Sequence, residues 1–248
     1  MEMFLPKEKF PSSYQHLALY TGNIVKSVIG RNSVLDKKTN MEILDAINNT
    51  LDYGDRLNYR YYKDTKLVEI PDLRSSSKID PEDRDHVEIT AKLFYLDSVG
   101  QETYADEAWD HLNKLLDINH IDTLITSNNR YWKSLENLVN LGKVQNLGVT
   151  DLSRHDLEDF LNQVEIKPKI NHIHVGECCH MPLDLIQLAK DKHIELLHNG
   201  DCTTILKTCE LTHLLQKYDL VRDEVFIPRW VLKYTVFIRS RNIVTDKG

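Results

Sequence analysis

The stretch Asn146-Leu-Gly-Val-Thr-Asp-Leu-Ser153, followed by Lys167-Pro-Lys-Ile-Asn-His-Ile-His-Val175, decides the fold of this chain. Its first apolar run ends in Gly148-Val-Thr150, and Ser153 stands where the N-cap residue of a helix is expected. Apolar residues follow at helical spacing, namely Leu157, Phe160, Leu161 and Val164. Strand, turn and helix therefore form one βα unit.

The same pattern repeats immediately along the chain. Ile170–Val175 is expected to be a second strand, Met181–Lys192 a helix, and Ile194–Leu197 a third strand. Strands that are joined through helical crossovers lie parallel. The stretch therefore predicts three parallel strands with two crossovers.

Strand and helix alternate in the rest of the chain as well. Further strands are expected at His16–Ile24, Val68–Ile70, Val87–Leu96, Ile121–Ile125 and Val236–Arg239. Further helices are expected at Met41–Leu51, Tyr104–Leu116, Tyr131–Leu141, Thr203–Leu215 and Arg229–Tyr234. The run from Asp52 to Lys66 has no clear period, so we expect a loop or an irregular insertion there. Alternation over a whole chain favours a parallel α/β fold.

The amino-acid sequence of these segments resembles that of the second half of an aldo-keto reductase barrel. Gly148-Val-Thr150 resembles the Gly-Val-Ser strand of that family, and Lys167-Pro-Lys-Ile-Asn-His172 resembles its Lys-Pro-x-x-Asn-Gln strand. A narrower resemblance, to the regulatory (modifier) subunit family of glutamate–cysteine ligase, lies in Glu177-Cys-Cys-His-Met-Pro-Leu-Asp-Leu185 and Ile227-Pro-Arg-Trp-Val-Leu-Lys-Tyr234.

The resemblance implies one α/β domain, a (β/α)8 TIM barrel of aldo-keto reductase type, over residues 16–248. Residues 1–15 are expected to be a loose N-terminal arm. Few residues follow Val236–Arg239, which predicts a missing or truncated closing helix. A length of 248 residues suits a single domain of this class.

Composition narrows the classes of partner. A net charge of -7 provides no positive field for nucleic acid or an anionic membrane, so neither partner is expected. The chain has no apolar run of spanning length and no signal-peptide pattern at Met1-Glu-Met-Phe-Leu-Pro-Lys7, and a cytoplasmic location is the expectation. Four cysteines are too few for a disulfide scaffold, so reduced thiols are expected.

Reductase chemistry in the aldo-keto family needs a tyrosine acid supported by a lysine, an aspartate and a histidine. Ile89-Thr-Ala-Lys92 resembles the lysine strand, which makes Lys92 a relic of the reductase lysine, expected to pair with Asp122 or Asp151. The counterpart of the histidine strand, Ile121–Ser127, ends without a histidine. The resemblance therefore implies an eroded site without catalytic residues.

The cofactor positions of the family are also changed. Thr150-Asp151, His172 and Asn199 stand where the family has its nicotinamide-binding side chains. Phe237-Ile-Arg-Ser240 keeps part of the phosphate motif, so Arg239 and Ser240 are candidates for a vestigial nucleotide-phosphate site. No cofactor is expected to be required, and NADPH is the candidate should one bind.

Cys178 and Cys179 are adjacent and are candidates for a redox or intersubunit thiol. The alternative is one buried residue and one inert exposed thiol. His172 and His174 share a strand face by period two, but no third ligand aligns with them, so no metal site is expected.

The resemblance implies a non-catalytic regulatory subunit in glutathione biosynthesis. Its partner would be the catalytic subunit of glutamate–cysteine ligase, with which it would form a heterodimer. By binding, it would tune the substrate affinity of that subunit and its feedback inhibition by glutathione. Trp132, Trp230 and Tyr131 are candidate aromatic anchors for that interface. Two alternatives stay open. One is an NADP-dependent aldo-keto reductase whose acid is Tyr59, Tyr61 or Tyr62, and the other is a dinucleotide-binding sensor without turnover.

Overall fold

A computed structural model describes residues 3–5, 11, 13–21, 24, 39–52, 59–70, 78–98, 100–174, 181–201, 204–222, 224–239 and 243–247. The chain forms two compact units. The small unit comprises Met1–Ser77, Thr203–Pro228 and Asp246–Gly248, and the sheet unit comprises Lys78–Cys202 and Arg229–Thr245. The chain therefore leaves the sheet unit after residue 202 and re-enters it at Arg229.

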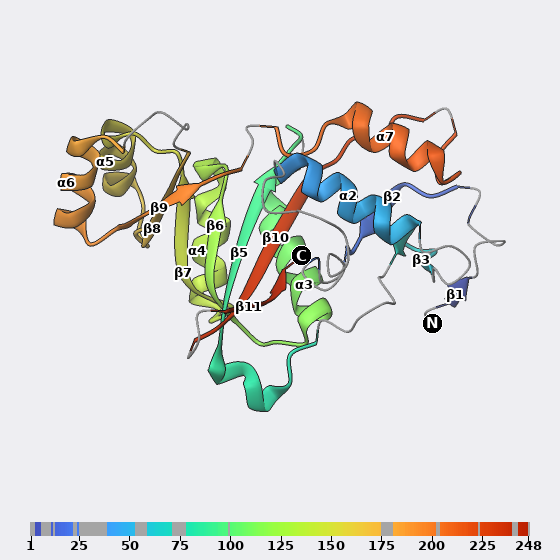
Figure 1. The fold of residues 1–248 in the computed structure, drawn as a ribbon, viewed down its shortest axis with the longest axis horizontal. Coiled ribbons are helices and arrows are strands. Elements are labelled where there is room, and N and C mark those ends of the chain that lie inside the picture. Colours follow the sequence, from blue (N-terminus) through green and yellow to red (C-terminus); the bar gives the residue numbers. More distant parts are fainter. Residues whose placement is uncertain are drawn as a thin grey trace. The chain divides into compact units, whose positions relative to one another are not determined.

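The sheet unit contains a seven-stranded sheet of order β11-β10-β5-β6-β7-β8-β9 (Figure 1). Its parallel part consists of β5 (Val87–Tyr95), β6 (Ile121–Thr126), β7 (Val144–Thr150), β8 (Ile170–His174) and β9 (Glu195–Asn199). The helices between them are α3 (Tyr104–Leu116), α4 (Trp132–Asn140), α5 (Arg154–Gln163) and α6 (Leu183–Lys192). These elements form a curled half-barrel, and the predicted α/β barrel class is confirmed in this truncated form.

The last part of the sheet differs from expectation. Arg229–Tyr234 was expected to be a helix, but β10 (Trp230–Ile238) is a single extended strand. It pairs antiparallel with β5 along its whole length, and β11 (Ile243–Lys247) follows at the sheet edge. The helix prediction was wrong because aromatic and β-branched residues dominate this run, and such side chains favour a strand with a buried neighbour.

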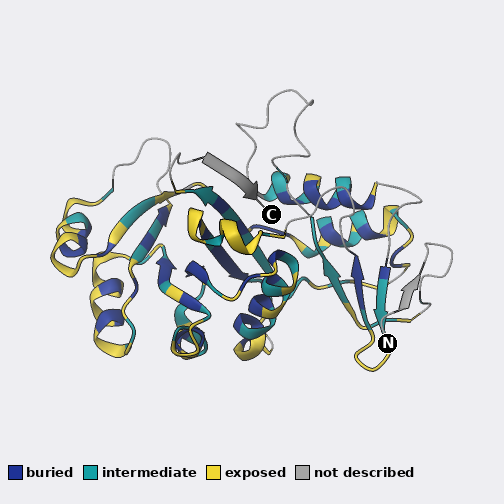
Figure 2. Cartoon of the chain, turned by 90° about the horizontal axis from the view of Figure 1, so that it is seen from below, coloured by how far each residue is buried: buried dark blue, intermediate teal, exposed yellow. Residues whose placement is uncertain are grey.

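The core of the sheet unit lies between the strands and the crossover helices. Ile89, Ala91 and Leu93 alternate along β5 and are fully buried, as period two requires. In α3 the buried residues recur at helical spacing, and Figure 2 shows the crossover helices with both buried and exposed residues. Gly148 of β7 is required by close packing, because a Cβ atom there would lie 3.0 Å from Ile125 Cγ1 and 3.2 Å from Ile170 Cβ.

Local signals in the sequence place several element ends correctly. The Ser153 hydroxyl accepts a hydrogen bond from the Asp156 amide at 3.2 Å, so the predicted N-cap of α5 is confirmed. Gly142 follows α4 with φ +71°, a conformation that favours glycine after a helix. α3 spans the predicted residues.

The small unit has a four-stranded sheet of order β1-β3-β4-β2. Its strands are β1 (Met3–Leu5), β2 (His16–Leu19), β3 (Tyr59–Tyr62) and β4 (Leu67–Ile70), and its helices include α2 (Thr39–Leu51) and α7 (Thr208–Lys217). The loop expected over Asp52–Lys66 is corrected, because β3 forms an antiparallel hairpin with β4. Tyrosine favours a half-buried strand, a preference that outweighs the polar character of the run.

The single domain expected over residues 16–248, with a loose arm at residues 1–15, remains a prediction. Within that arm the structure pairs β1 with β3. Among the helices that the structure describes, none combines the length and the apolar character needed to cross a membrane.

Candidate functional site

Lys92 lies within β5, between β6 on one side and β10 on the other. In the antiparallel pairing with β10, Lys233 is the residue directly opposite Lys92. Side chains of directly opposed residues project from the same face of a sheet. Only 8% of the Lys92 side chain and 19% of the Lys233 side chain are exposed. Two poorly hydrated ammonium groups therefore lie close together and need a carboxylate.

Asp201 supplies that carboxylate from the second position after β9. Its Oδ2 accepts a hydrogen bond from Lys92 Nζ at 2.6 Å, and its Oδ1 accepts one from Lys233 Nζ at 2.8 Å. The Asp201 side chain is 12% exposed. We call these three residues the Lys92 cluster. Through it, one carboxylate joins two adjacent strands to the carboxyl end of β9.

Electrostatics and burial act in opposite directions on Asp201. Burial by itself would raise the pKa of Asp201, but the charges and hydrogen bonds of Lys233 and Lys92 outweigh it and hold the pKa well below its usual range. Burial lowers the pKa of Lys92, and the hydrogen bond and charge of Asp201 oppose that effect only in part. The carboxylate is therefore ionised throughout the neutral range.

The partner of Lys92 differs from the two residues named from the sequence. Asp201 holds it, whereas Asp122 pairs elsewhere and Asp151 acts on Lys92 only through its charge. Asp201 and Lys233 were not predicted from the sequence. The available signal for Asp201 was its position just after an apolar strand, and the signal for Lys233 was its position inside the apolar run of residues 230–238. The second signal was overlooked because the start of that run was assigned to a helix.

His172 of β8 lies close enough to the Lys92 cluster to respond to its charges. Burial lowers the pKa of His172, and the positive charge of Lys92 lowers it further. Its Nδ1 atom is buried and has no hydrogen-bond partner among the described residues. The neutral imidazole thus leaves an unused polar atom near the cluster.

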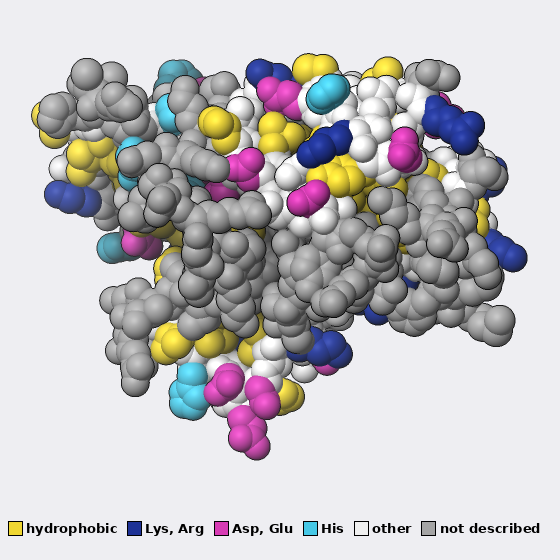
Figure 3. All heavy atoms as spheres, turned by 45° about the vertical axis from the view of Figure 1, so that its right-hand side comes forward, with side chains coloured by type: hydrophobic (Ala, Val, Ile, Leu, Met, Phe, Trp, Pro, Cys, Tyr) yellow, Lys and Arg dark blue, Asp and Glu magenta, His cyan; other side chains and the backbone are white. Residues whose placement is uncertain are grey.

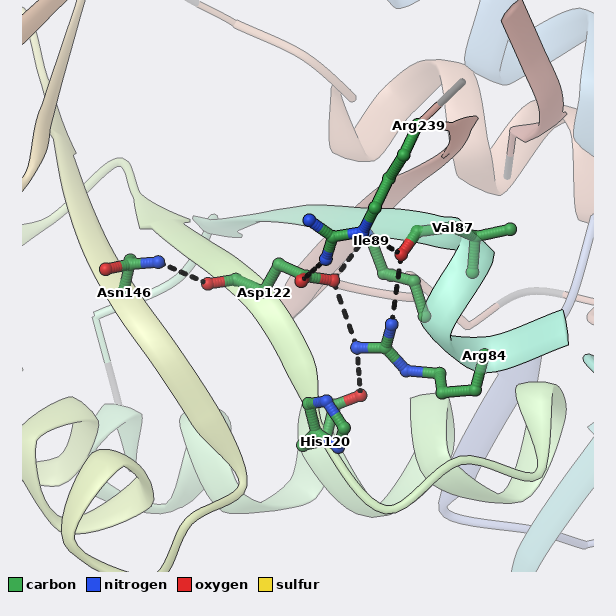
Figure 4. Close-up of polar contacts among 7 residues, drawn as sticks. All are labelled: Arg84, Val87, Ile89, His120, Asp122, Asn146 and Arg239. Atoms are coloured by element: carbon green, nitrogen blue, oxygen red, sulfur yellow. Dashed lines mark hydrogen bonds and ion pairs between the residues drawn. The ribbon is translucent and has the colours of Figure 1, made fainter. Parts of the chain in front are cut away.

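Asp122 is the centre of a second polar cluster, at the amino end of β6 (Figure 4). Its carboxylate accepts hydrogen bonds from the Ile89 amide at 2.8 Å, from Arg84 Nη2 at 3.0 Å and from Arg239 Nη2. Arg84 belongs to the 3-10 helix η3 (Pro81–His86), whose acidic residues are exposed at the bottom of Figure 3. Arg84 therefore turns inward while its acidic neighbours face solvent.

Arg239 lies beside the first residue of β5, and Lys92 lies further along the same strand. Arg239 Nε donates to the Val87 carbonyl at 3.0 Å, and Val87 begins β5 five residues before Lys92. At strand spacing this separation is about 17 Å. Arg239 is bonded to Asp122 and Val87, so a nucleotide phosphate held by Arg239 would have to share or displace these partners. Ser240, the other predicted phosphate ligand, lies outside the described residues.

Comparison with known proteins decides the family. No protein-family model matches the chain. The glutamate–cysteine ligase regulatory subunit of Homo sapiens is 30% identical over an alignment of 253 positions, covering 94% of this chain and 90% of that protein. The chain belongs to the glutamate–cysteine ligase regulatory subunit family.

Two further proteins are similar to this family member over much of the chain. A putative glutamate–cysteine ligase regulatory subunit of Schizosaccharomyces pombe is 26% identical, with 94% of this chain and 95% of that protein covered. The solved structure of a Bombyx mori aldo-keto reductase in complex with NADP is 14% identical, covers 73% of this chain and 58% of its own, and has a TM-score of 0.39.

The environment of the two thiols that are candidates for a redox or intersubunit role stays a prediction. Cys178 and Cys179 lie outside the described residues, and Cys209 on α7 is a free, exposed thiol. His172 and His174 both belong to β8. Across the part of the chain that the structure describes, no three histidine, cysteine, aspartate or glutamate side chains are grouped as a metal site requires.

The three aromatic residues proposed as anchors have different environments. Trp132 is 3% exposed and donates through Nε1 to the Ile166 carbonyl at 3.0 Å, so it belongs to the core. Trp230 is partly buried, and its Nε1 atom donates to Glu107 at 3.3 Å. Tyr131 stacks on Tyr95 with ring centroids 5.9 Å apart and remains partly exposed. Trp230 and Tyr131 therefore remain candidates for a surface of the regulatory subunit.

Proposed function

We propose that this chain is a non-catalytic regulatory subunit that binds the catalytic subunit of glutamate–cysteine ligase. By binding, it tunes the affinity of that subunit for substrate and its feedback inhibition by glutathione. The observation that carries the proposal is the 30% identity to the human regulatory subunit over nearly the full length of both proteins.

The environment of Lys92 supports a non-catalytic role. In the reductase mechanism a lysine lowers the pKa of a tyrosine acid, so its ammonium must face the tyrosine hydroxyl. Here Lys92 Nζ bonds to Asp201, and among the described residues no hydrogen bond joins it to a tyrosine hydroxyl. Burial raises the pKa of Tyr59, one of the alternative acids, to about 12. This shift is opposite to the shift that the acid needs.

Regulation of this kind requires no chemistry from the regulatory chain. If the chain binds one conformation of the catalytic subunit more tightly than another, it shifts the population toward the first. Linkage then requires substrate and inhibitor affinities to change whenever those ligands also prefer one conformation. A coupling of about 1–3 kcal/mol is typical and changes an affinity by roughly 5- to 150-fold.

Assembly is the first test of the proposal. The intact chain is mixed with the glutamate–cysteine ligase catalytic subunit from the same organism, and the mass of the complex is measured by sedimentation in reducing buffer. We expect a heterodimer at micromolar concentration. Separate sedimentation of the two chains at that concentration would contradict the proposal.

The reductase and sensor alternatives are tested on this chain by itself. NADPH oxidation is followed with a panel of aldehydes, and NADPH fluorescence is titrated with the intact chain. We expect neither turnover nor a saturable change in fluorescence. Turnover would favour the NADP-dependent reductase, and saturable binding without turnover would favour the sensor.

A further inference from the structure

We propose that Lys92 and Lys233 form a receptor for a small carboxylate, that Asp201 occupies it from within the chain, and that an external carboxylate competes with Asp201 for it. The proposal goes beyond the regulatory function, because this chain would bind the carboxylate by itself, without the catalytic subunit.

The geometry of the two lysines is that of a carboxylate site. Their ammonium groups come from adjacent strands and bind the two oxygens of one carboxylate, at 2.6 and 2.8 Å. Hydrogen bonds between two charged groups are roughly twice as strong as neutral ones. Any small carboxylate that reaches the same position meets the same pair of donors.

The lysines and the aspartate are held with different rigidity. Lys92 and Lys233 lie within β5 and β10, which pair over nine residues, whereas Asp201 follows the end of β9. One residue later the chain leaves the sheet unit, and it returns at Arg229, close to Lys233. The receptor is therefore preorganised, and its occupant is attached at the point where the chain leaves the unit.

Removal of Asp201 would leave two poorly exposed ammonium groups without their shared carboxylate. Asp151 also faces this region and its charge acts on both Lys92 and His172, but its side chain is exposed, so solvent screens it. The buried Nδ1 atom of His172 has no partner among the described residues and offers a further polar contact. A vacated receptor therefore favours an anion.

Competition with a tethered group requires a substantial ligand concentration. A group on a short tether acts at millimolar effective concentration, so the external carboxylate must be present in that range or above. If the lysines are free in roughly 1–10% of molecules, the intact chain binds a carboxylate about 10- to 100-fold more weakly than a chain without the Asp201 carboxylate.

Acetate is a suitable probe because it is a small molecule that carries the carboxylate group removed in Asp201→Ala. The intact chain, Asp201→Ala, the double variant Asp201→Ala/Lys233→Gln and the control Glu165→Ala are titrated with sodium acetate by calorimetry at constant ionic strength. Glu165 is 75% exposed and pairs on the surface with Lys133, which also pairs with Glu136, so its removal deletes a carboxylate from an ion pair but creates no buried receptor.

We expect Asp201→Ala to bind acetate at least about tenfold more tightly than the intact chain. The double variant loses this gain, and Glu165→Ala behaves as the intact chain does. Equal acetate binding by Asp201→Ala and the double variant, or no saturable binding by Asp201→Ala, would overturn the proposal. If Asp201→Ala is unfolded in chloride, acetate must restore its circular dichroism, and failure to fold in both salts counts against the receptor.

A measurement on the unmodified chain provides an independent test. Acetate that displaces Asp201 should accelerate amide hydrogen exchange at the carboxyl end of β9 in a saturable way, while exchange in α3 stays constant. Exchange at β9 that does not respond to acetate would contradict the competition.

Discussion

Lys233 lies directly opposite Lys92 in the antiparallel pairing of β10 with β5, and the carboxylate of Asp201 accepts a hydrogen bond from each. The arrangement places a lysine pair, rather than a lysine beside a tyrosine acid, within the sheet. It connects the fold of the last strand to the proposed loss of reductase chemistry, because the strand that replaces the expected helix also supplies the second lysine.

Removal of the Asp201 carboxylate should destabilise the sheet unit strongly. Breaking a buried ion pair by deleting one partner typically costs about 3–5 kcal/mol, since the remaining charge is poorly hydrated. We expect Asp201→Ala to fall near the lower figure, because its lysine partners keep 8% and 19% of their side chains exposed. Urea unfolding in chloride measures the loss, with Glu165→Ala as a control that should change the midpoint little. A similar midpoint for both variants would contradict the role of the Lys92 cluster.

The same cluster predicts a dependence of stability on acid. The folded pKa of Asp201 is lowered mainly because the two lysines outweigh burial. Its contribution is therefore fully present above the unfolded pKa of aspartate, about 3.9, and is lost as the pH falls from there toward the folded pKa. The free energy of unfolding, measured against pH in the intact chain and in Asp201→Asn, should converge below about pH 3.9. If the two free energies of unfolding differ by a constant amount across that pH range, the charge of the Asp201 carboxylate does not stabilise the fold.

Gly148 should tolerate no side chain. A Cβ atom at 3.0 Å from Ile125 and 3.2 Å from Ile170 forces the strands β6 and β8 to give way. Overpacking of this kind costs about 1–3 kcal/mol. The matched control is Gly200→Ala, because a Cβ atom on Gly200 meets nothing within 4 Å. The midpoint of thermal unfolding should be lower for Gly148→Ala than for Gly200→Ala. Equal midpoints would show that the contact at Gly148 relaxes without penalty.

The adjacent thiols lead to a prediction about assembly rather than stability. If Cys178 or Cys179 joins the two subunits, oxidation should produce a covalent heterodimer on a non-reducing gel. Replacing both with serine should remove that band and leave non-covalent assembly at micromolar concentration intact, because the disulfide acts by raising effective concentration. A band that persists in the double variant would move the link to Cys202 or Cys209. A band that is absent from the unmodified pair would refute the disulfide.

Local patterns allowed most of the sheet unit to be predicted. α3, β5 and the Ser153 cap follow from residues close in sequence, and their signals agree with the tertiary structure. β3 was missed because its tyrosine-rich run pairs with β4 despite its polar character, and the start of β10 was assigned to a helix although aromatic and β-branched residues dominate it. The Lys92–Asp201 pair joins residues 109 positions apart, a contact that no local pattern encodes.

The most direct test of the central claim is the glutamate concentration that gives half the maximal rate of the catalytic subunit, measured as this chain is added. The account predicts that this concentration falls saturably, reaches its limit near one chain per catalytic subunit, and is accompanied by a change in the glutathione concentration needed for half-inhibition. An inert carrier protein at the same concentration should have no effect. Identical glutamate and glutathione curves with and without this chain, at concentrations where the two subunits are present in equal amounts, would contradict the account.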